Sequence, residues 1–176
     1  MTIHQEHPFA EEGDDPVRRF RGRLGGTVSL WTAGAAPDRV GLTLTSFMLV
    51  HGEPARVIGA VDPESALAES LADSPELVVQ LLEWRHRGLA EAFAGMMPAP
   101  GGAFRAGEWR DTEWGPLLTD ASAWLGARLV GEPRPSGWSL LVEAAVEHVE
   151  VASSEQPLLH RRGRYLSLGQ AGVDSA

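Results

Sequence analysis

The sequence predicts a mainly β domain of the α+β class, in which antiparallel strands form a barrel and a few short helices connect them. Short runs rich in β-branched and aromatic residues recur between turn signals of Gly, Pro and Asp. The run 138–151 alternates in hydrophobicity and then changes face near Glu147, which predicts a bulged strand. Long antiparallel strands with such a shift are more typical of barrels than of helix-covered parallel sheets.

Composition limits the classes of protein that the chain can belong to. Its 176 residues suffice for one domain with a substantial core and are few for two. The net charge of −9 argues against a nucleic-acid partner. The lack of cysteine excludes disulfides, thiolate nucleophiles and iron–sulfur clusters. The sequence has no long apolar run for a membrane span and no signal-peptide pattern, so we expect a cytoplasmic protein without a membrane partner.

The predicted elements follow from local patterns of hydrophobicity and turn residues. A helix begins at Asp62 as N-cap, with Pro63 in its first turn, and ends at Ser74. A second helix covers residues 85–94, with Gly95 as its C-cap. The stretch around Trp109 and Trp114 is expected to be irregular, with both indoles packed inside. Strands are expected at residues 24–32, 40–50, 56–61, 76–82, 121–131, 138–151 and 157–168.

The two ends of the chain are expected to differ from the domain between them. Residues 1–20 form a flexible acidic tail, residues 21–170 form the domain, and residues 171–176 fray. Four arginines, Arg18, Arg19, Arg21 and Arg23, form a short basic cluster at the start of the domain. Such a cluster is usually a solvated face and less often contacts a partner subunit or a ligand phosphate.

The most informative stretch is Gly41-Leu42-Thr43-Leu44-Thr45-Ser46-Phe47, which places three hydroxyls beside a glycine. Hydroxyls and free N–H groups at this density suit a phosphate or the polar edge of a planar cofactor. A Thr/Ser-rich strand with no ligand is the alternative, since threonine favours strands. The helix start at Asp62–Ser65 can likewise hold an anion or simply cap itself. The six histidines show no ligand spacing, and no metal site is predicted.

Several segments occur in an order that is typical of one family. They are Val28-Ser29-Leu30-Trp31-Thr32, the hydroxyl stretch 41–47, Gly52-Glu53-Pro54, the run 57–61, Asp62-Pro63-Glu64-Ser65, the stretch 89–95, Gly115-Pro116-Leu117-Leu118, Pro157-Leu158-Leu159-His160 and Gly163-Arg164-Tyr165. Over residues 24–168 the chain resembles the flavin reductase-like family of FMN-binding split β-barrels. The resemblance implies a homodimeric split β-barrel with Greek-key features and a flavin groove where two copies meet.

The resemblance also implies roles for individual residues. Thr43, Leu44, Thr45 and Ser46 would meet the ribityl phosphate of FMN, with FAD as the second possibility. Asp62 and Ser65 would lie near that phosphate, and Thr32 would approach the flavin ring. NAD(P)H would stack on the exposed ring and reduce it.

The activity implied is that of an NAD(P)H-dependent flavin reductase, which can supply reduced flavin to a monooxygenase. Three departures affect this implication: Leu49-Val50-His51 replaces the family's S-x-S, Glu53-Pro54 replaces P-P, and Gly137-Trp138-Ser139 replaces G-D-H. The last removes a histidine that lies near the ring and the nicotinamide, so no catalytic residue is assigned. Two alternatives stay open. One is a split barrel that binds flavin or haem without turnover, and the other is an enzyme that oxidises a small substrate with its own flavin.

Overall fold

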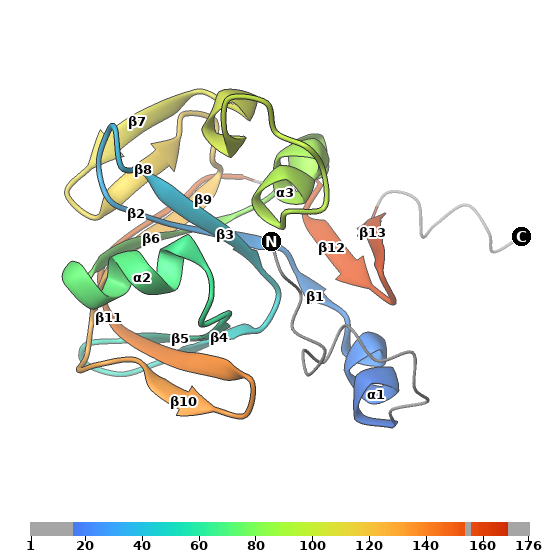
Figure 1. The fold of residues 1–176 in the computed structure, drawn as a ribbon, viewed down its shortest axis with the longest axis horizontal. Helices are drawn as coiled ribbons and strands as arrows, with labels where there is room; N and C mark the ends of the chain where they lie inside the picture. Colours follow the sequence, from blue (N-terminus) through green and yellow to red (C-terminus); the bar gives the residue numbers. More distant parts are fainter. Residues whose placement is uncertain (1–15, 154–155, 169–176) are drawn as a thin grey trace, which may run out of the picture.

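The computed structural model describes residues 16–153 and 156–168. Most of the chain forms one antiparallel sheet with the strand order β3-β2-β6-β9-β11-β5-β4, to which β10 adds beside β11 (Figure 1). The strands of this sheet are β2 (Ser29–Ala33), β3 (Val40–Leu44), β4 (Phe47–Val50), β5 (Arg56–Val61), β6 (Glu76–Leu81), β9 (Ala123–Leu129), β10 (Arg134–Ser136) and β11 (Ser139–Val151).

The sheet is a barrel that is split between its first and last strands. β3 and β4 lie at opposite ends of the strand order, yet only Thr45 and Ser46 separate them in the chain. The sheet must therefore curl until its two edges come together at this bend. The prediction of a mainly β split barrel is confirmed, whereas the prediction of one continuous strand over residues 40–50 is wrong. The bend at Thr45–Ser46 divides that run between the two edges.

The barrel interior is filled from both sides of the curl. Trp31 is fully buried, and its ring lies so close to Gly59 that a Cβ there would be 2.6 Å from it. Leu67 and Leu71 of α2 (Ala66–Asp73) belong to the same buried cluster, so α2 fills the concave side of the sheet (Figure 1). A side chain at position 59 would displace the largest ring of this core.

β11 contains the bulge that the sequence predicts near Glu147. Its pairing with β9 shifts register between Val146 and His148. Before the shift Val142 and Ala144 are buried, and after it Val149 and Val151 are exposed. The extra residue bends β11, the longest strand of the sheet, which pairs with both β5 and β9.

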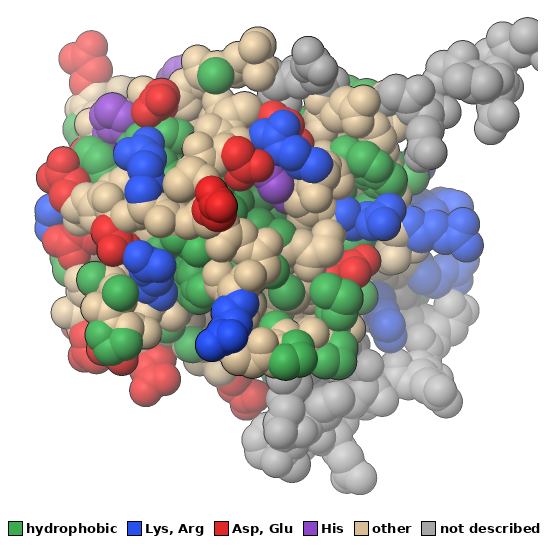
Figure 2. All heavy atoms as spheres, turned by 90° about the horizontal axis from the view of Figure 1, so that it is seen from above, with side chains coloured by type: hydrophobic (Ala, Val, Ile, Leu, Met, Phe, Trp, Pro, Cys, Tyr) green, Lys and Arg blue, Asp and Glu red, His purple; other side chains and the backbone are tan. Residues whose placement is uncertain are grey.

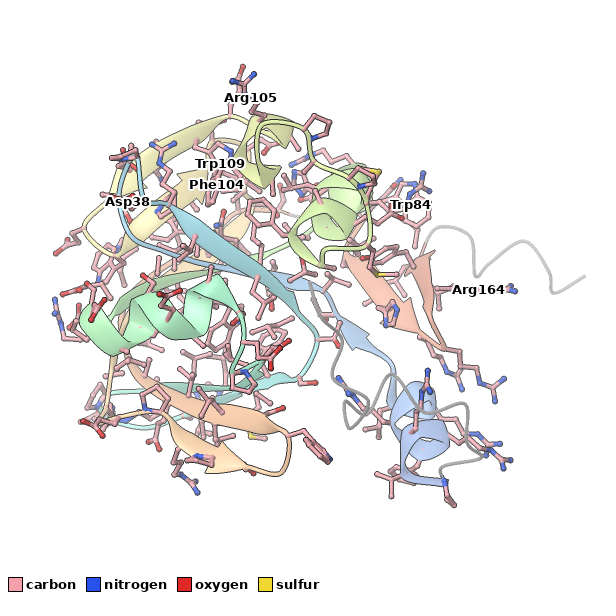
Figure 3. The ribbon with its side chains drawn as sticks, viewed as in Figure 1. Asp38, Trp84, Phe104, Arg105, Trp109 and Arg164 are labelled. Carbon is pink, nitrogen blue, oxygen red and sulfur yellow. The ribbon has the colours of Figure 1, made fainter. Side chains whose placement is uncertain are left out.

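A second core lies outside the barrel, beneath α3 (Arg87–Phe93) and the hairpin of β7 (Trp109–Thr112) and β8 (Gly115–Leu118). The short 3-10 helices η1 (Trp84–His86) and η2 (Ala103–Ala106) flank α3. The irregular stretch expected around Trp109 is wrong, because it forms this hairpin. The ring centroids of Trp109 and of Phe104 in η2 lie 4.7 Å apart in an edge-to-face contact (Figure 3). The predicted inward packing of Trp109 is therefore correct.

The ends of the described chain form a separate small layer. β1 (Gly26–Thr27), β12 (Leu158–Arg161) and β13 (Arg164–Ser167) form a three-stranded sheet, against which α1 (Pro16–Leu24) stands (Figure 1). No residue of α1 is buried. Residues 16–20, expected within the acidic tail, are the first five of this helix. The rest of the predicted N-terminal tail and the predicted frayed C-terminal residues 171–176 lie outside the described residues.

Candidate functional site at the barrel rim

The hydroxyl segment, Thr43–Ser46, forms the end of β3 and the bend that leads to β4. Thr43 Oγ1 donates to Ala90 O of α3 at 2.8 Å, and Ser29 Oγ donates to Leu44 O at 2.9 Å. These two bonds fix the end of β3 from both sides. Thr45 is exposed and Ser46 is half-buried. Within the described residues neither of these two hydroxyls makes a hydrogen bond, so both can bind a ligand.

Three chain segments meet beside this bend. The N–H of Ala60 donates to Ser46 O at 2.9 Å, which ties the bend to the end of β5. Val61, the last residue of β5, pairs with Leu140 near the start of β11. The hydroxyl segment, the turn after Val61 and the Gly137–Ser139 turn before β11 therefore share one end of the barrel. We call this end the rim.

The turn after Val61 caps α2 in a different way from the one predicted. Ser65, not Asp62, is the N-cap: its Oγ accepts from the N–H of Ala68 at 3.2 Å and donates to Asp62 O at 2.6 Å. The Asp62 carboxylate accepts from the N–H of Glu64 at 2.9 Å. Asp62 thus closes a turn before the helix, because a helix started there would leave no residues for the chain to change direction after β5. Both side chains are engaged in shaping this turn.

Thr32 lies away from the rim surface, inside the protein. It is fully buried; its Oγ1 donates to Pro116 O at 2.6 Å and accepts from Gln80 Nε2 at 3.1 Å. Gln80 Oε1 in turn accepts from the N–H of Leu118 at 2.8 Å. This network joins β2 and β6 to β8. A flavin ring could reach the Thr32 hydroxyl only if the network opened.

Exposed apolar side chains lie at the rim and along β4, the strand that leads away from it. Met48, Leu49 and Val50 of β4 are 59%, 57% and 42% exposed, and Trp138 is 65% exposed. β4 is an edge strand of the sheet, and its side chains project on both faces of the edge. Three consecutive exposed apolar residues on an unpaired edge are typical of a surface that a partner covers.

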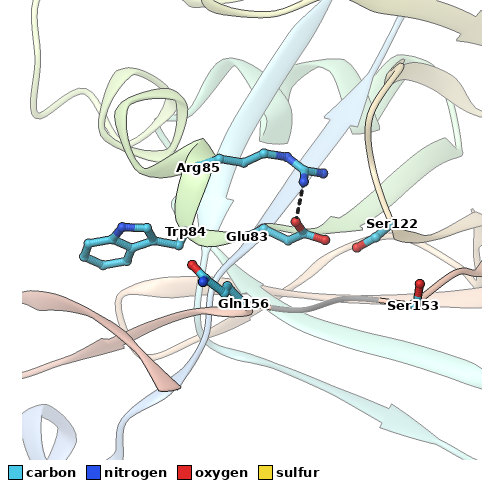
Figure 4. Close-up of a pocket in the computed structure, with 6 residues that line it drawn as sticks. All are labelled: Glu83, Trp84, Arg85, Ser122, Ser153 and Gln156. Carbon is cyan, nitrogen blue, oxygen red and sulfur yellow. Dashed lines mark ion pairs between the residues drawn. The ribbon is translucent and has the colours of Figure 1, made fainter. Parts of the chain in front are cut away.

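A charged cluster that sequence reasoning missed lies on the far side of α3. Arg85 contacts Glu83 at 2.7 Å and Asp120 at 3.1 Å, beside a cavity of about 500 Å³ that Trp84, Ser122 and Gln156 also line (Figure 4). His86 is buried; its Nδ1 accepts from the N–H of Glu83 at 3.1 Å, so Nε2 carries the proton toward Asp120 Oδ2 at 3.0 Å.

The charged residues of this cluster pair with one another, which indicates a structural role. Burial raises the pKa of the Asp120 carboxyl, but the hydrogen bond from His86 and the charge of Arg85 outweigh burial and leave the pKa below its ordinary value. Every charged member has an opposite partner. The spacing of Glu83, Arg85 and His86 could have indicated a polar turn. The contact of this turn with Asp120 could not be predicted from the sequence.

Two further observations bear on the kind of site. Within residues 16–153 and 156–168, no group of three or more His, Asp or Glu side chains is placed to hold a metal ion. In that same part of the chain, every helix is too short or too polar to cross a lipid bilayer.

The fold and the rim define a split-barrel protein with an open, hydroxyl-bearing site between the two edges of its sheet. The sequence pattern of the flavin reductase like domain matches residues 21–169. This chain belongs to the flavin reductase like domain family.

Two curated proteins are similar to most of the chain. The FADH(2)-dependent resorcinol hydroxylase, reductase component, of Rhizobium sp. (strain MTP-10005) is 30% identical over 156 residues, covering 87% of this chain and 86% of that protein. The FMN reductase (NADH) RutF of Methylorubrum extorquens (strain DSM 6343 / CIP 106787 / DM4) is 30% identical over 155 residues, covering 88% and 75%.

Solved structures share the fold at lower identity. The flavin reductase PheA2 in its native state has a TM-score of 0.78 at 22% identity, covering 89% of this chain and 98% of that chain. The NADH:FAD oxidoreductase SgcE6 of Streptomyces globisporus C-1027, in complex with NAD and FAD fragments, has a TM-score of 0.78 at 20% identity, covering 100% and 99%.

Proposed function

We propose that this protein is an NAD(P)H-dependent flavin reductase that supplies reduced flavin to a separate monooxygenase. The observation that carries the proposal is the pair of unengaged hydroxyls, Thr45 and Ser46, at the bend between the two sheet edges of a flavin reductase like domain. The names of its relatives support it, since one is the reductase component of a hydroxylase and another is an FMN reductase (NADH).

The rim fits the phosphate end of a flavin nucleotide. The hydroxyls of Thr45 and Ser46 can donate to phosphate oxygens, while the bonds of Thr43 and Leu44 keep the bend in place. Asp62 carries a negative charge and Ser65 is committed to capping α2, so we assign these two residues to shaping the rim. Thr32 supports β2 from within and is a positioning residue.

The protein has to bind and orient its cofactor more than to catalyse proton transfer. A flavin held at the rim by Thr45 and Ser46 would supply the redox chemistry with NAD(P)H as reductant. Trp138, which stands beside Ser139, the residue at the position of the family's histidine, offers a flat exposed surface for an aromatic ring at the rim. Its indole N–H is a donor but cannot take up a proton. Trp138 can therefore contribute by positioning the flavin ring and the nicotinamide ring.

The rim is open in a single chain, which supports a homodimer. The hydroxyl segment does not line the cavities beside Arg85, beside His86 and Leu89, or beside Leu71 and Leu129. The apolar edge strand β4 begins directly after Ser46 and carries the exposed side chains of Met48 and Leu49. A second copy seated on β4 would bury this edge and provide the missing wall of the flavin site.

The binding of flavin is tested with the double variant Thr45→Val/Ser46→Ala. Loss of two hydrogen bonds to a charged phosphate should weaken FMN or FAD by about 2–5 kcal/mol, or roughly 30- to 4000-fold. Isothermal titration calorimetry measures this loss, and Thr119→Val, an exposed threonine away from the rim, is the matched control. Riboflavin, which lacks the phosphate, should bind both proteins equally. Equal FMN and FAD affinity in the double variant and the wild type would remove the hydroxyls from the site.

Turnover is tested separately from binding. The wild type mixed with flavin and NADH or NADPH under anaerobic conditions should bleach the flavin absorbance. If flavin binds and neither nicotinamide reduces it, the reductase activity is refuted and a binding protein without turnover is left. The replacement of the family's G-D-H histidine by Ser139 is the observation that favours this second candidate.

A further inference from the structure

Seven arginines gather in the small layer at the ends of the described chain. They belong to α1 and to the β12–β13 hairpin, and neither segment contains an acidic residue. We call them the arginine cluster: Arg18, Arg19, Arg21, Arg23, Arg161, Arg162 and Arg164. The whole chain has a net charge of −9, so this cluster is a strong local exception. Figure 2 shows basic side chains toward the right edge of the molecule and acidic ones toward the left.

The cluster is held together by contacts between α1 and the hairpin. The N–H of Arg162 donates to Gly22 O at 3.0 Å. The aliphatic stem of Arg161 lies against Gly25, where a Cβ would be 3.5 Å from it. Burial, followed by the charge of Arg21, lowers the pKa of His160 on β12. The positive field of the helix therefore reaches the hairpin, as expected if the arginines converge on one region.

This cluster adjoins the hydroxyl segment. Gly26, one residue after the glycine that Arg161 covers, packs so closely on the bend that a Cβ there would be 3.3 Å from Thr45 O. A ligand phosphate held by Thr45 and Ser46 would thus have the arginine cluster as its neighbour. The exposed acidic residues of the rim, Asp62 and Glu64, follow β5 and belong to neither α1 nor the β12–β13 hairpin.

Two of the arginines are suited to bind a ligand. Arg18, Arg19 and Arg21 have interactions of their own, and Arg164 points away from the barrel (Figure 3). Of the remaining arginines, Arg23, Arg161 and Arg162 have no ion-pair partner among the described residues, and of the two on the hairpin Arg161 is the one that lies against Gly25; we therefore select Arg23 and Arg161. Both are exposed. Phe20, three residues before Arg23 and therefore its neighbour on the helix surface, is 68% exposed.

We propose that Arg23 and Arg161 bind the second phosphate of a dinucleotide flavin and that Phe20 stacks on its adenine, so that the protein selects FAD over FMN. This inference rests on the proposed function. FMN ends at the phosphate that the hydroxyl segment would hold, whereas FAD continues through a second phosphate to adenosine. Guanidinium groups bind phosphate oxygens through two parallel N–H bonds, and an aromatic ring stacks on any base. Arg23 and Phe20 of α1 would then contact the same FAD molecule.

The test compares the dissociation constants of FAD and FMN for four proteins by calorimetry. They are the wild type, Arg23→Gln, Arg161→Gln and the control Arg134→Gln, which removes an exposed arginine of β10. The wild type should bind FAD at least tenfold more tightly than FMN. Each cluster variant should weaken FAD about tenfold or more and change FMN by less than about twofold. The control should change neither, and added salt should reduce the preference of the wild type for FAD.

The outcomes separate this inference from the proposed function. Equal affinity of the wild type for FAD and FMN, or an equal loss of both flavins in Arg23→Gln and Arg161→Gln, would overturn the selection by arginines and leave flavin binding intact. Failure of every flavin to bind the wild type would overturn the proposed function itself. A loss of FAD affinity in Phe20→Ala, with FMN affinity kept, would support the adenine contact, and no loss would remove Phe20 from it.

Discussion

Replacement of Thr32 by valine should destabilise the fold without touching the flavin. Valine keeps the shape of the side chain but removes the bond to Pro116 O and the acceptor for Gln80 Nε2. A buried polar group that loses its partner costs about 1–3 kcal/mol. Gln80 Nε2 retains a longer contact with Pro116 O at 3.3 Å, which offsets part of the loss. We therefore expect the free energy of unfolding to fall by about 2 kcal/mol.

Urea unfolding followed by tryptophan fluorescence measures this change, at one protein concentration because assembly affects stability. Thr32→Val, Gln80→Leu and the double variant form a cycle whose coupling energy should be about 1 kcal/mol or more if the two side chains act together. Thr45→Val is the matched control and should stay within about 0.5 kcal/mol of the wild type, since its hydroxyl is exposed. If Thr32→Val has normal stability but has lost flavin affinity, the structural role of the buried hydrogen bonds is refuted. Thr32 would then be a residue that contacts the flavin ring.

Three further predictions follow from other contacts. Gly126→Ala should cost about 1–3 kcal/mol of stability, because a Cβ there would be 2.2 Å from the Trp114 ring; Gly88→Ala, in open space on α3, should instead stabilise by up to about 1 kcal/mol in the same thermal unfolding assay. The folded-state pKa of Asp120 is lowered, so its carboxylate stabilises the fold above its unfolded pKa and ceases to do so as the pH falls; the stability gap between wild type and Asp120→Asn should therefore shrink from pH 7 to about pH 3 in urea titrations. Leu49→Arg should shift sedimentation from dimer to monomer, and Val130→Arg, also exposed but in the bend after β9, should not; a dimer that survives Leu49→Arg would exclude β4 from the interface.

Features that depend on neighbouring residues along the chain were predictable. The strand over residues 56–61 has the bounds expected from its β-branched run, and the change of face near Glu147 is a register shift in the structure. Ala94, not the predicted Gly95, is the C-cap of α3, and Gly95 follows it with a φ of 68°, the left-handed conformation that glycine favours at the end of a helix. Each of these features is written in local periodicity or in a single residue type, so no tertiary information was needed.

Features that depend on distant contacts were not predictable. The run 40–50 has the composition of one strand, and only the closure of the sheet breaks it at Thr45–Ser46. The hairpin of residues 109–118 lacks regular alternation because its buried residues, Leu117 and Leu118, both pack under other elements. Asp62 and Ser65 are equally good cap residues, and the geometry of the chain leaving β5 decided between them.

The candidate site shows the same division. The hydroxyls of Thr43, Thr45 and Ser46 could be found from their density in the sequence, but not that only the last two are unengaged. A Thr in a β-rich run can point to either face, so burial of Thr32 required the structure. The arginines at residues 161–164 lie far from α1 in sequence, and only the β1–β12 pairing brings them together.

The Thr45–Ser46 bend, which joins the two edge strands of the sheet, links ligand binding to the rigidity of the whole sheet. Two residues span the distance between the first and last strands, so any molecule that grips Thr45 and Ser46 restrains both of those strands at once. Amide hydrogens of β3 and β4 should then slow their exchange together when ligand is added, although the two strands make no ladder with each other. A residue inserted between Thr45 and Ser46 would uncouple β3 from β4 and lower the affinity for the ligand.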